Sequence, residues 1–259
     1  MSKIIYIDGQ APNASGYSQL QMSAADKAAV RAFGMISCLS ADGFYRQAGD
    51  LRFRDVKSGG DGVLNGSPVI SDNANFSGKR TLDLNEASSA KMPNGSADVY
   101  SFTVILALSI SSADSGDAII AARYNSSGTR VADWLRYNSL AQTPGIFIIP
   151  SATNLPGTAG ATIPLASVPL DQPFVLTASF DAVTGRVTGR INSTEVVSTV
   201  VTGTPVEDAL AYLTYGFQAP AGLVGSIARS YVYQENLLAN IAGKADVVTL
   251  EQALLSEYT

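Results

Sequence analysis

The stretch PFVLTASFDAVTGRVTGRINSTEVV, residues 173–197, decides the fold class of this chain. From Phe174 to Asp181 large apolar residues alternate with smaller or polar ones, and successive side chains of a strand point to opposite faces. Gly185 supplies a turn residue that accepts a positive φ, and a second alternating run follows over 186–192. A further turn leads into a run rich in valine and threonine. We therefore expect three consecutive antiparallel strands, with one face buried and the other facing water.

Composition limits the classes of protein to which the chain can belong. Its 259 residues are 46% hydrophobic and 15% charged, which is enough apolar material for one large all-β domain or two smaller ones. The net charge of −5 argues against a nucleic-acid partner, because such a protein needs a basic face. No apolar run approaches the roughly 18 residues of a membrane span, so membrane insertion is not expected.

The N-terminus and the cysteine content favour folding in a reducing cytoplasm. The start MSKIIYIDGQ lacks the long apolar core of a signal peptide, unless a leader has been removed. Cys38 is the single cysteine and cannot form an internal disulfide, so we interpret it as a small buried apolar residue.

The pattern of glycines and apolar runs predicts four segments. We expect an N-terminal arm over 1–57, a glycine-rich linker over 58–75, a β-sandwich over 76–240 and a C-terminal helix over 241–259. The arm contains a possible strand at 3–8, a helix over 24–33 with Ser23 as its N-cap and Gly34 at its end, and two possible strands at 35–39 and 44–54. The arm is a candidate anchoring segment.

The C-terminal segment carries an apolar stripe at helical spacing. We expect a short helical turn over 235–241 that stops at Gly243, and a last helix capped by Asp246. The stripe consists of Val247, Leu250, Leu254 and Tyr258. It packs either on this chain's own domain or on another subunit.

Four runs resemble the concanavalin A-like, or laminin G-like, jelly-roll family. They are FSGKRTLDL (76–84), SFTVILAL (101–108), the hairpin 174–192 and GLVGSIARSYVYQENL (222–237). The resemblance implies an all-β fold, an antiparallel β-sandwich (jelly roll), here with a short α/β N-terminal arm and one or two C-terminal helices. Asn192–Ser193 departs from the Asn-Gly pair that is common in the family's hairpins. This fold carries lectins, glycan hydrolases and scaffolds, so it does not decide the function.

The sequence lacks the residues expected of an enzyme with this fold. Glucanases of the superfamily use a Glu-x-Asp-x-x-Glu cluster on one strand, whereas Asp83 and Glu86, the nearest pair, fall on opposite faces. With no histidine, a Ser-His-Asp triad is excluded. We therefore predict that the chain is not an enzyme.

Two small groups of residues are candidate ligand sites. The resemblance implies Ca²⁺ as the metal, and Asp114 and Asp117 are its candidate ligands, the alternative being an ordinary polar turn. No other cofactor is expected. Alternation in ADWLRYN places Trp134, Arg136 and Asn138 on one face, where an exposed tryptophan and arginine suit a sugar or a protein. The alternative is a tryptophan packed under a loop.

A lectin-like sandwich without an export signal or disulfides suits a tailed-bacteriophage virion protein, made in the host cytoplasm and released by lysis. We predict a structural subunit of capsid or tail, homo-oligomeric and bound to other virion proteins. The alternative is a receptor-recognition module that binds a host surface glycan. A glycan hydrolase ranks third.

Overall fold

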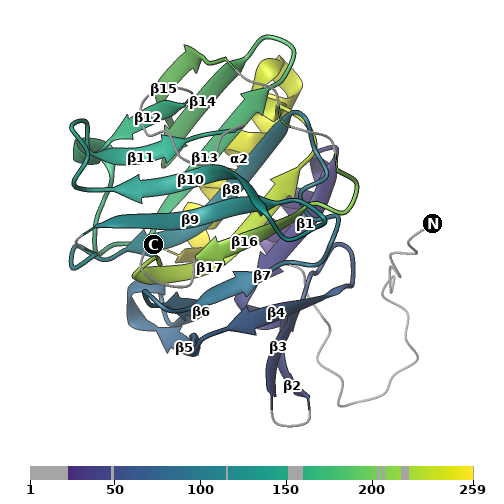
Figure 1. Cartoon of the computed structure of the whole chain (residues 1–259), viewed down its shortest axis with the longest axis vertical. Coiled ribbons are helices and arrows are strands. Elements are labelled where there is room, and N and C mark those ends of the chain that lie inside the picture. Colours follow the sequence, from purple (N-terminus) through teal and green to yellow (C-terminus); the bar gives the residue numbers. More distant parts are fainter. Residues whose placement is uncertain are drawn as a thin grey trace.

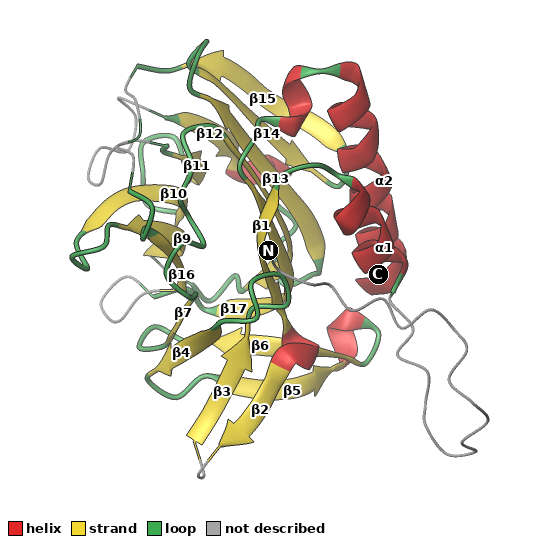
Figure 2. Ribbon diagram, turned by 90° about the vertical axis from the view of Figure 1, so that its right-hand side faces the viewer, coloured by secondary structure: helices red, strands yellow, loops and turns green. Residues whose placement is uncertain are grey.

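The computed structural model describes residues 23–47, 50–114, 116–150, 160–202, 205, 208–216 and 222–258. Over these residues the chain forms two antiparallel sheets packed face to face, with two α-helices outside one of them (Figures 1 and 2). The predicted antiparallel β-sandwich is confirmed. The expected strand at 3–8 lies outside the described residues. No helix in the described part of the chain has the length and apolar character needed to cross a membrane.

The opening stretch forms three consecutive strands, as predicted. They are β13 (Phe174–Asp181), β14 (Arg186–Ile191) and β15 (Thr194–Val200). The loop between β14 and β15 has two residues with positive φ, Asn192 at 48° and Ser193 at 68°. These angles match the two-residue turn that suits the twist of a hairpin, so serine here adopts a conformation usually given to glycine. Apolar side chains at alternate positions of β13 enter the core, from Phe174 to Phe180.

The eight-stranded sheet has the order β15-β14-β13-β8-β17-β6-β5, with β1 also paired to β17. Its other strands are β8 (Phe102–Ile110), β17 (Gly225–Tyr233), β6 (Lys79–Leu84), β5 (Val69–Asn73) and β1 (Met35–Ser40). Gly225 begins β17 at a point of close approach, since a Cβ there would lie 2.2 Å from the Ser109 carbonyl oxygen. A glycine is therefore required where the closing strand joins β8.

The nine-stranded sheet has the order β12-β11-β10-β9-β16-β7-β4-β3-β2 and lies in front in Figure 1. Its strands are β12 (Ala161–Pro164), β11 (Gly145–Ile148), β10 (Arg130–Asn138), β9 (Asp117–Tyr124), β16 (Tyr212–Gly216), β7 (Ser89–Lys91), β4 (Asp61–Asn65), β3 (Asp50–Arg54) and β2 (Phe44–Gln47). The pairing of β9 with β10 shifts register at three points. Such bulges change which face a side chain occupies.

Two α-helices and several short 3-10 helices accompany the sheets in the described part of the chain. α1 (Ala24–Arg31) starts as predicted, because the Ser23 Oγ accepts a hydrogen bond from the Asp26 backbone N–H at 3.0 Å. α2 (Ile241–Tyr258) is the long C-terminal helix. Four single-turn 3-10 helices are η1 (Ala41–Gly43), η2 (Ala74–Phe76), η3 (Leu165–Ser167) and η4 (Leu237–Ala239). Figure 2 shows α1 and α2 together on the outer face of the eight-stranded sheet.

That outer face was expected to meet water, and this prediction is wrong because α2 covers it. Glu251 of α2 accepts hydrogen bonds from Arg190 Nε at 3.0 Å, from Arg190 NH2 at 2.9 Å and from the Thr177 hydroxyl at 2.7 Å. The Arg190 and Glu251 side chains are only 4% and 1% exposed. A buried ion pair therefore fixes α2 on β13 and β14.

The α2 stripe also corrects the prediction of a subunit contact. The side chains of Val247, Leu250, Leu254 and Tyr258 are all buried within the chain, in a cluster with α1 and the outer face of the eight-stranded sheet. The stripe serves packing on the chain's own sheet, which was the stated alternative.

The start of α2 differs from the prediction as well. Gly243 lies inside the first turn of α2 and not at a helix end. A glycine is needed there because a Cβ would lie 2.3 Å from the Leu237 carbonyl oxygen. Asn240 binds the first turn in place of the predicted cap Asp246, through a 2.8 Å hydrogen bond from the Gly243 N–H to its side chain.

The predicted arm and linker do not lie outside the sandwich. The arm supplies β1, β2 and β3, while β4 and β5 lie in the stretch expected to be a linker. Glycines in that stretch allow close packing: a Cβ on Gly62 would lie 2.0 Å from the Phe53 ring. The sandwich therefore begins well before residue 76.

Candidate functional site

A row of charged and aromatic side chains crosses the outer face of the nine-stranded sheet. We call it the polar stripe, and it consists of Lys91, Asp117, Tyr124, Arg130, Asp133, Arg136 and Tyr212. Strand pairing places these residues together, since Tyr212 pairs with Tyr124 and Tyr124 pairs with Arg130. Of this set, sequence reasoning identified only Arg136 and Asp117. The charges of β10, at 130, 133 and 136, were the available signal.

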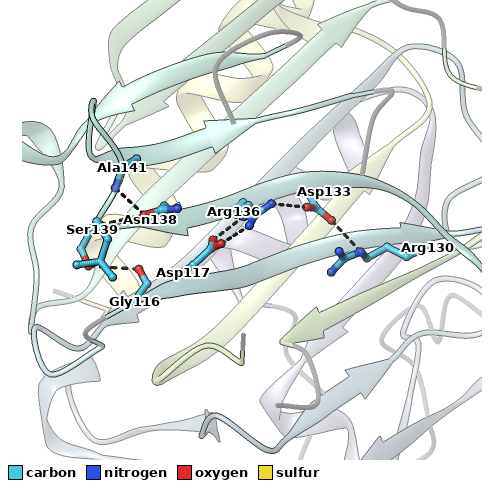
Figure 3. A network of polar contacts seen from close by, with 9 residues as sticks. Gly116, Asp117, Arg130, Asp133, Arg136, Asn138, Ser139 and Ala141 are labelled. Atoms are coloured by element: carbon cyan, nitrogen blue, oxygen red, sulfur yellow. Dashed lines mark hydrogen bonds and ion pairs between the residues drawn. The ribbon is translucent and has the colours of Figure 1, made fainter. Parts of the chain in front are cut away.

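Arg136 is held between two carboxylates (Figure 3). Its Nε and NH2 groups both donate to the Asp117 carboxylate, and its NH1 donates to Asp133 Oδ2 at 3.3 Å. On the other side, Arg130 Nε lies 3.4 Å from Asp133 Oδ1. The hydrogen bonds that Arg136 donates to Asp117 raise the pKa of the guanidinium, which stays charged. The planar guanidinium is thus fixed in one orientation.

The two carboxylates differ in their access to solvent. The Asp133 side chain is 0% exposed, and burial raises the pKa of its carboxyl group. The Asp117 side chain is 35% exposed. Asp133 therefore binds Arg136 from a buried position, while Asp117 binds it from a partly exposed one.

An aromatic pair continues the stripe. The rings of Tyr124 and Tyr212 stack with centroids 5.3 Å apart and planes 4° apart. Lys91 Nζ lies 3.9 Å from the centroid of the Tyr212 ring, which is a cation–π contact. Burial raises the pKa of the Tyr124 hydroxyl, so it remains a neutral donor and acceptor. The stripe thus offers hydroxyl groups, a fixed guanidinium and an ammonium group.

Trp134 is not part of this surface, and the prediction that it is exposed is wrong. Its side chain is fully buried and stacks on Phe102, with ring centroids 4.1 Å apart. An extra residue on β10 between Ala132 and Leu135 breaks the alternation, so that Trp134 and Leu135 both face the core. Trp134 cannot stack on a sugar in this arrangement.

Asn138 belongs to the sheet end and not to an open binding face. It is 8% exposed, and its side-chain oxygen accepts the backbone N–H groups of Leu140 at 2.9 Å and Ala141 at 2.8 Å (Figure 3). It pairs across the ladder with Asp117. Its described role is to shape the turn beside the stripe.

The candidate metal ligands have other partners. Asp114 accepts the Val224 backbone N–H at 3.0 Å, and burial raises the pKa of its carboxyl group. The Asp117 carboxylate is occupied by Arg136. Within the described ranges, no three histidine, cysteine, aspartate or glutamate side chains gather as a metal site would require. Calcium binding stays a prediction from the sequence.

Comparisons with known proteins identify the fold. No family model matches the sequence, and no curated protein matches it. The chain is similar to domain 4 of AbnA, a GH43 extracellular arabinanase from Geobacillus stearothermophilus, which was solved in complex with arabinotriose. The TM-score is 0.59 at 16% sequence identity, and the match covers 85% of this chain and 98% of the arabinanase domain. It is also similar to Trypanosoma rangeli sialidase in complex with sialic acid, with a TM-score of 0.59 and 14% identity over 87% of this chain. The match spans 34% of the sialidase chain, about a third of its length. At such identities these likenesses establish a lectin-like β-sandwich.

The same comparison corrects the prediction that the chain is not an enzyme. The structures it resembles belong to enzymes, an arabinanase and a sialidase. The missing Glu-x-Asp-x-x-Glu cluster is specific to one group of glucanases, so its absence does not exclude catalysis.

Proposed function

We propose that the chain binds an oligosaccharide on the polar stripe. The observation that carries this proposal is the fixed Arg136, held by Asp117 and Asp133 on the same sheet face as the stacked tyrosines, of which Tyr124 pairs with Arg130. Sugar sites combine apolar ring surface with a few oriented polar groups. Groups that are already held in position lose little freedom when a ligand arrives, which favours binding.

Two of the similar structures support the same class of ligand. The arabinanase domain was solved with arabinotriose and the sialidase with sialic acid. Both ligands are saccharides. The match to this chain covers 98% of the arabinanase domain. These likenesses suggest which saccharides to try first.

The experiment is calorimetric titration of the full chain with arabino-oligosaccharides and with sialyllactose, followed by a broader glycan array. Replacing Asp117 by asparagine frees Arg136 on one side, and we expect saccharide affinity to fall at least fivefold. The matched control is Asp72→Asn, which removes a carboxylate from an ion pair with Arg80 at 3.6 Å on the other sheet. Equal affinities for the two variants would contradict the proposal.

Hydrolysis is measured in the same mixtures by the release of reducing sugar. The array separates a saccharide-binding chain from one that binds only proteins, since the latter would show no saccharide signal. The setting proposed from the sequence remains a bacteriophage virion and a host surface glycan. Antibody labelling of phage particles in the electron microscope tests that setting.

A further inference from the structure

The outer face of the nine-stranded sheet is locally basic in an acidic chain. Among the strand residues whose side chains are described, its outward positions carry five basic groups: Arg52, Arg54, Lys91, Arg130 and Arg136. They carry three acidic groups: Asp61, Asp117 and Asp133. The whole chain has a net charge of −5. The described strand residues of this face therefore carry a net positive charge, whereas the whole chain has a net negative charge.

The three acidic groups are already neutralised by arginines on the same face. Arg54 Nε lies 3.1 Å from Asp61 Oδ1, and Arg136 and Arg130 pair with Asp117 and Asp133. Among the described residues, no carboxylate lies within ion-pair distance of Lys91 or Arg52. The surplus positive charge of the face is concentrated on these two side chains.

Lys91 and Arg52 stand on either side of an exposed apolar residue. Val63 of β4 pairs directly with Lys91 of β7 and is 52% exposed. On the other side of β4, Phe53 of β3 pairs with Gly62, which places Arg52 beside Val63. Two strand spacings, roughly 10 Å, separate the backbone positions of Lys91 and Arg52. The Lys91 ammonium group lies over the ring of Tyr212, which holds it by a cation–π contact.

We propose that the saccharide bound by this face is acidic, an oligosaccharide of uronic acids whose carboxylates pair with Lys91 and Arg52. Two sugar carboxylates along a chain can meet two cations carried two strand spacings apart, while the exposed Val63 between them contacts the apolar face of a sugar ring. Positive charge on an acidic protein also directs an acidic ligand to this face. The inference rests on the proposed saccharide binding and names the class of saccharide.

The test compares oligogalacturonate with a neutral maltohexaose of similar length, by calorimetry on the full chain at 50 and 200 mM NaCl. We expect oligogalacturonate to bind and its affinity to fall with salt, because salt screens exposed charges. Lys91→Gln and Arg52→Gln should each weaken it about three- to tenfold. Lys79→Gln, on β6 of the other sheet, removes the same charge and should have no effect. Circular dichroism verifies that each variant is folded.

The outcomes separate this inference from the proposed function. Equal binding of maltohexaose without salt dependence would overturn the acidic class and leave saccharide binding standing. Binding of neither oligosaccharide, with no hit on the array, would overturn both. Single-stranded DNA of equal charge is included, and equal affinity for it would overturn the inference by showing general attraction to polyanions.

Discussion

Replacing Glu251 by glutamine tests how α2 is attached to the sandwich. The variant keeps the shape of the side chain and removes its charge. Arg190, 4% exposed, then loses its anion and keeps one described contact, from NH2 to the Ser193 carbonyl oxygen at 2.5 Å. Breaking a buried pair by removing one partner costs about 3–5 kcal/mol, because the other charge is left without compensation.

The structure places the expected loss near the lower end of that range. Glutamine retains one acceptor oxygen for Thr177 or for Arg190 Nε, while its amide group faces the Arg190 NH2 donor. We therefore expect the free energy of unfolding to fall by about 3 kcal/mol. For a domain of this size, that corresponds to a decrease in Tm of about 6–12 °C.

Guanidinium unfolding followed by the fluorescence of Trp134, the single tryptophan, measures this loss. Asp61→Asn is the matched control, because its ion pair with Arg54 is exposed, and its midpoint should not move. The double replacement of Arg190 and Glu251 by leucine should recover much of the stability, since an apolar pair has no charge to desolvate. A loss below about 1 kcal/mol for Glu251→Gln would refute the reasoning.

Three further predictions concern the core and the stripe. Gly225→Ala places a methyl group against the Ser109 carbonyl and should cost about 1–3 kcal/mol of stability, measured by urea unfolding; an unchanged midpoint would contradict the close approach. Trp134→Ala removes the ring stacked on Phe102 and should lower the free energy of unfolding by about 3–5 kcal/mol, measured by thermal unfolding. Reduced saccharide affinity with unchanged stability would instead show that Trp134 is a surface residue. Because burial raises the pKa of Asp133, its contribution to stability is present below the pKa of the unfolded chain and is lost as pH rises through the higher folded value. The Tm of Asp133→Asn relative to the natural chain should therefore rise between pH 3.5 and 7, and a falling difference would show that the ion pairs with arginine dominate.

The sequence predicts those parts of the fold that depend on local alternation. β13 and β14 were found because each inner residue alternates with an outer one. Their outer face was misjudged because its cover, α2, lies about sixty residues later in the chain. A glutamate inside the apolar stripe of a helix, Glu251 beside Leu250, was the one local sign of a buried partner.

The site was harder to predict because bulges and long-range pairing create it. In ADWLRYN strict alternation gives Trp134 and Arg136 the same face, and one extra residue on β10 separates them. Tyr124 and Tyr212 are far apart in the sequence and meet only when β16 pairs with β9. The glycine-rich stretch was interpreted as a linker, whereas its glycines admit the Phe53 ring.

The two outer faces of the sandwich have different roles. Helices and a buried ion pair cover much of the eight-stranded sheet, and the nine-stranded sheet carries the fixed charges and the aromatic pair (Figure 2). A surface held by strand pairing needs little rearrangement to bind, so its affinity should not depend on how firmly α2 is docked on the opposite sheet. Glu251→Gln, assayed well below its melting temperature, is therefore expected to bind saccharide as the natural chain does. A parallel loss of affinity and stability would show that the two faces are coupled through the core.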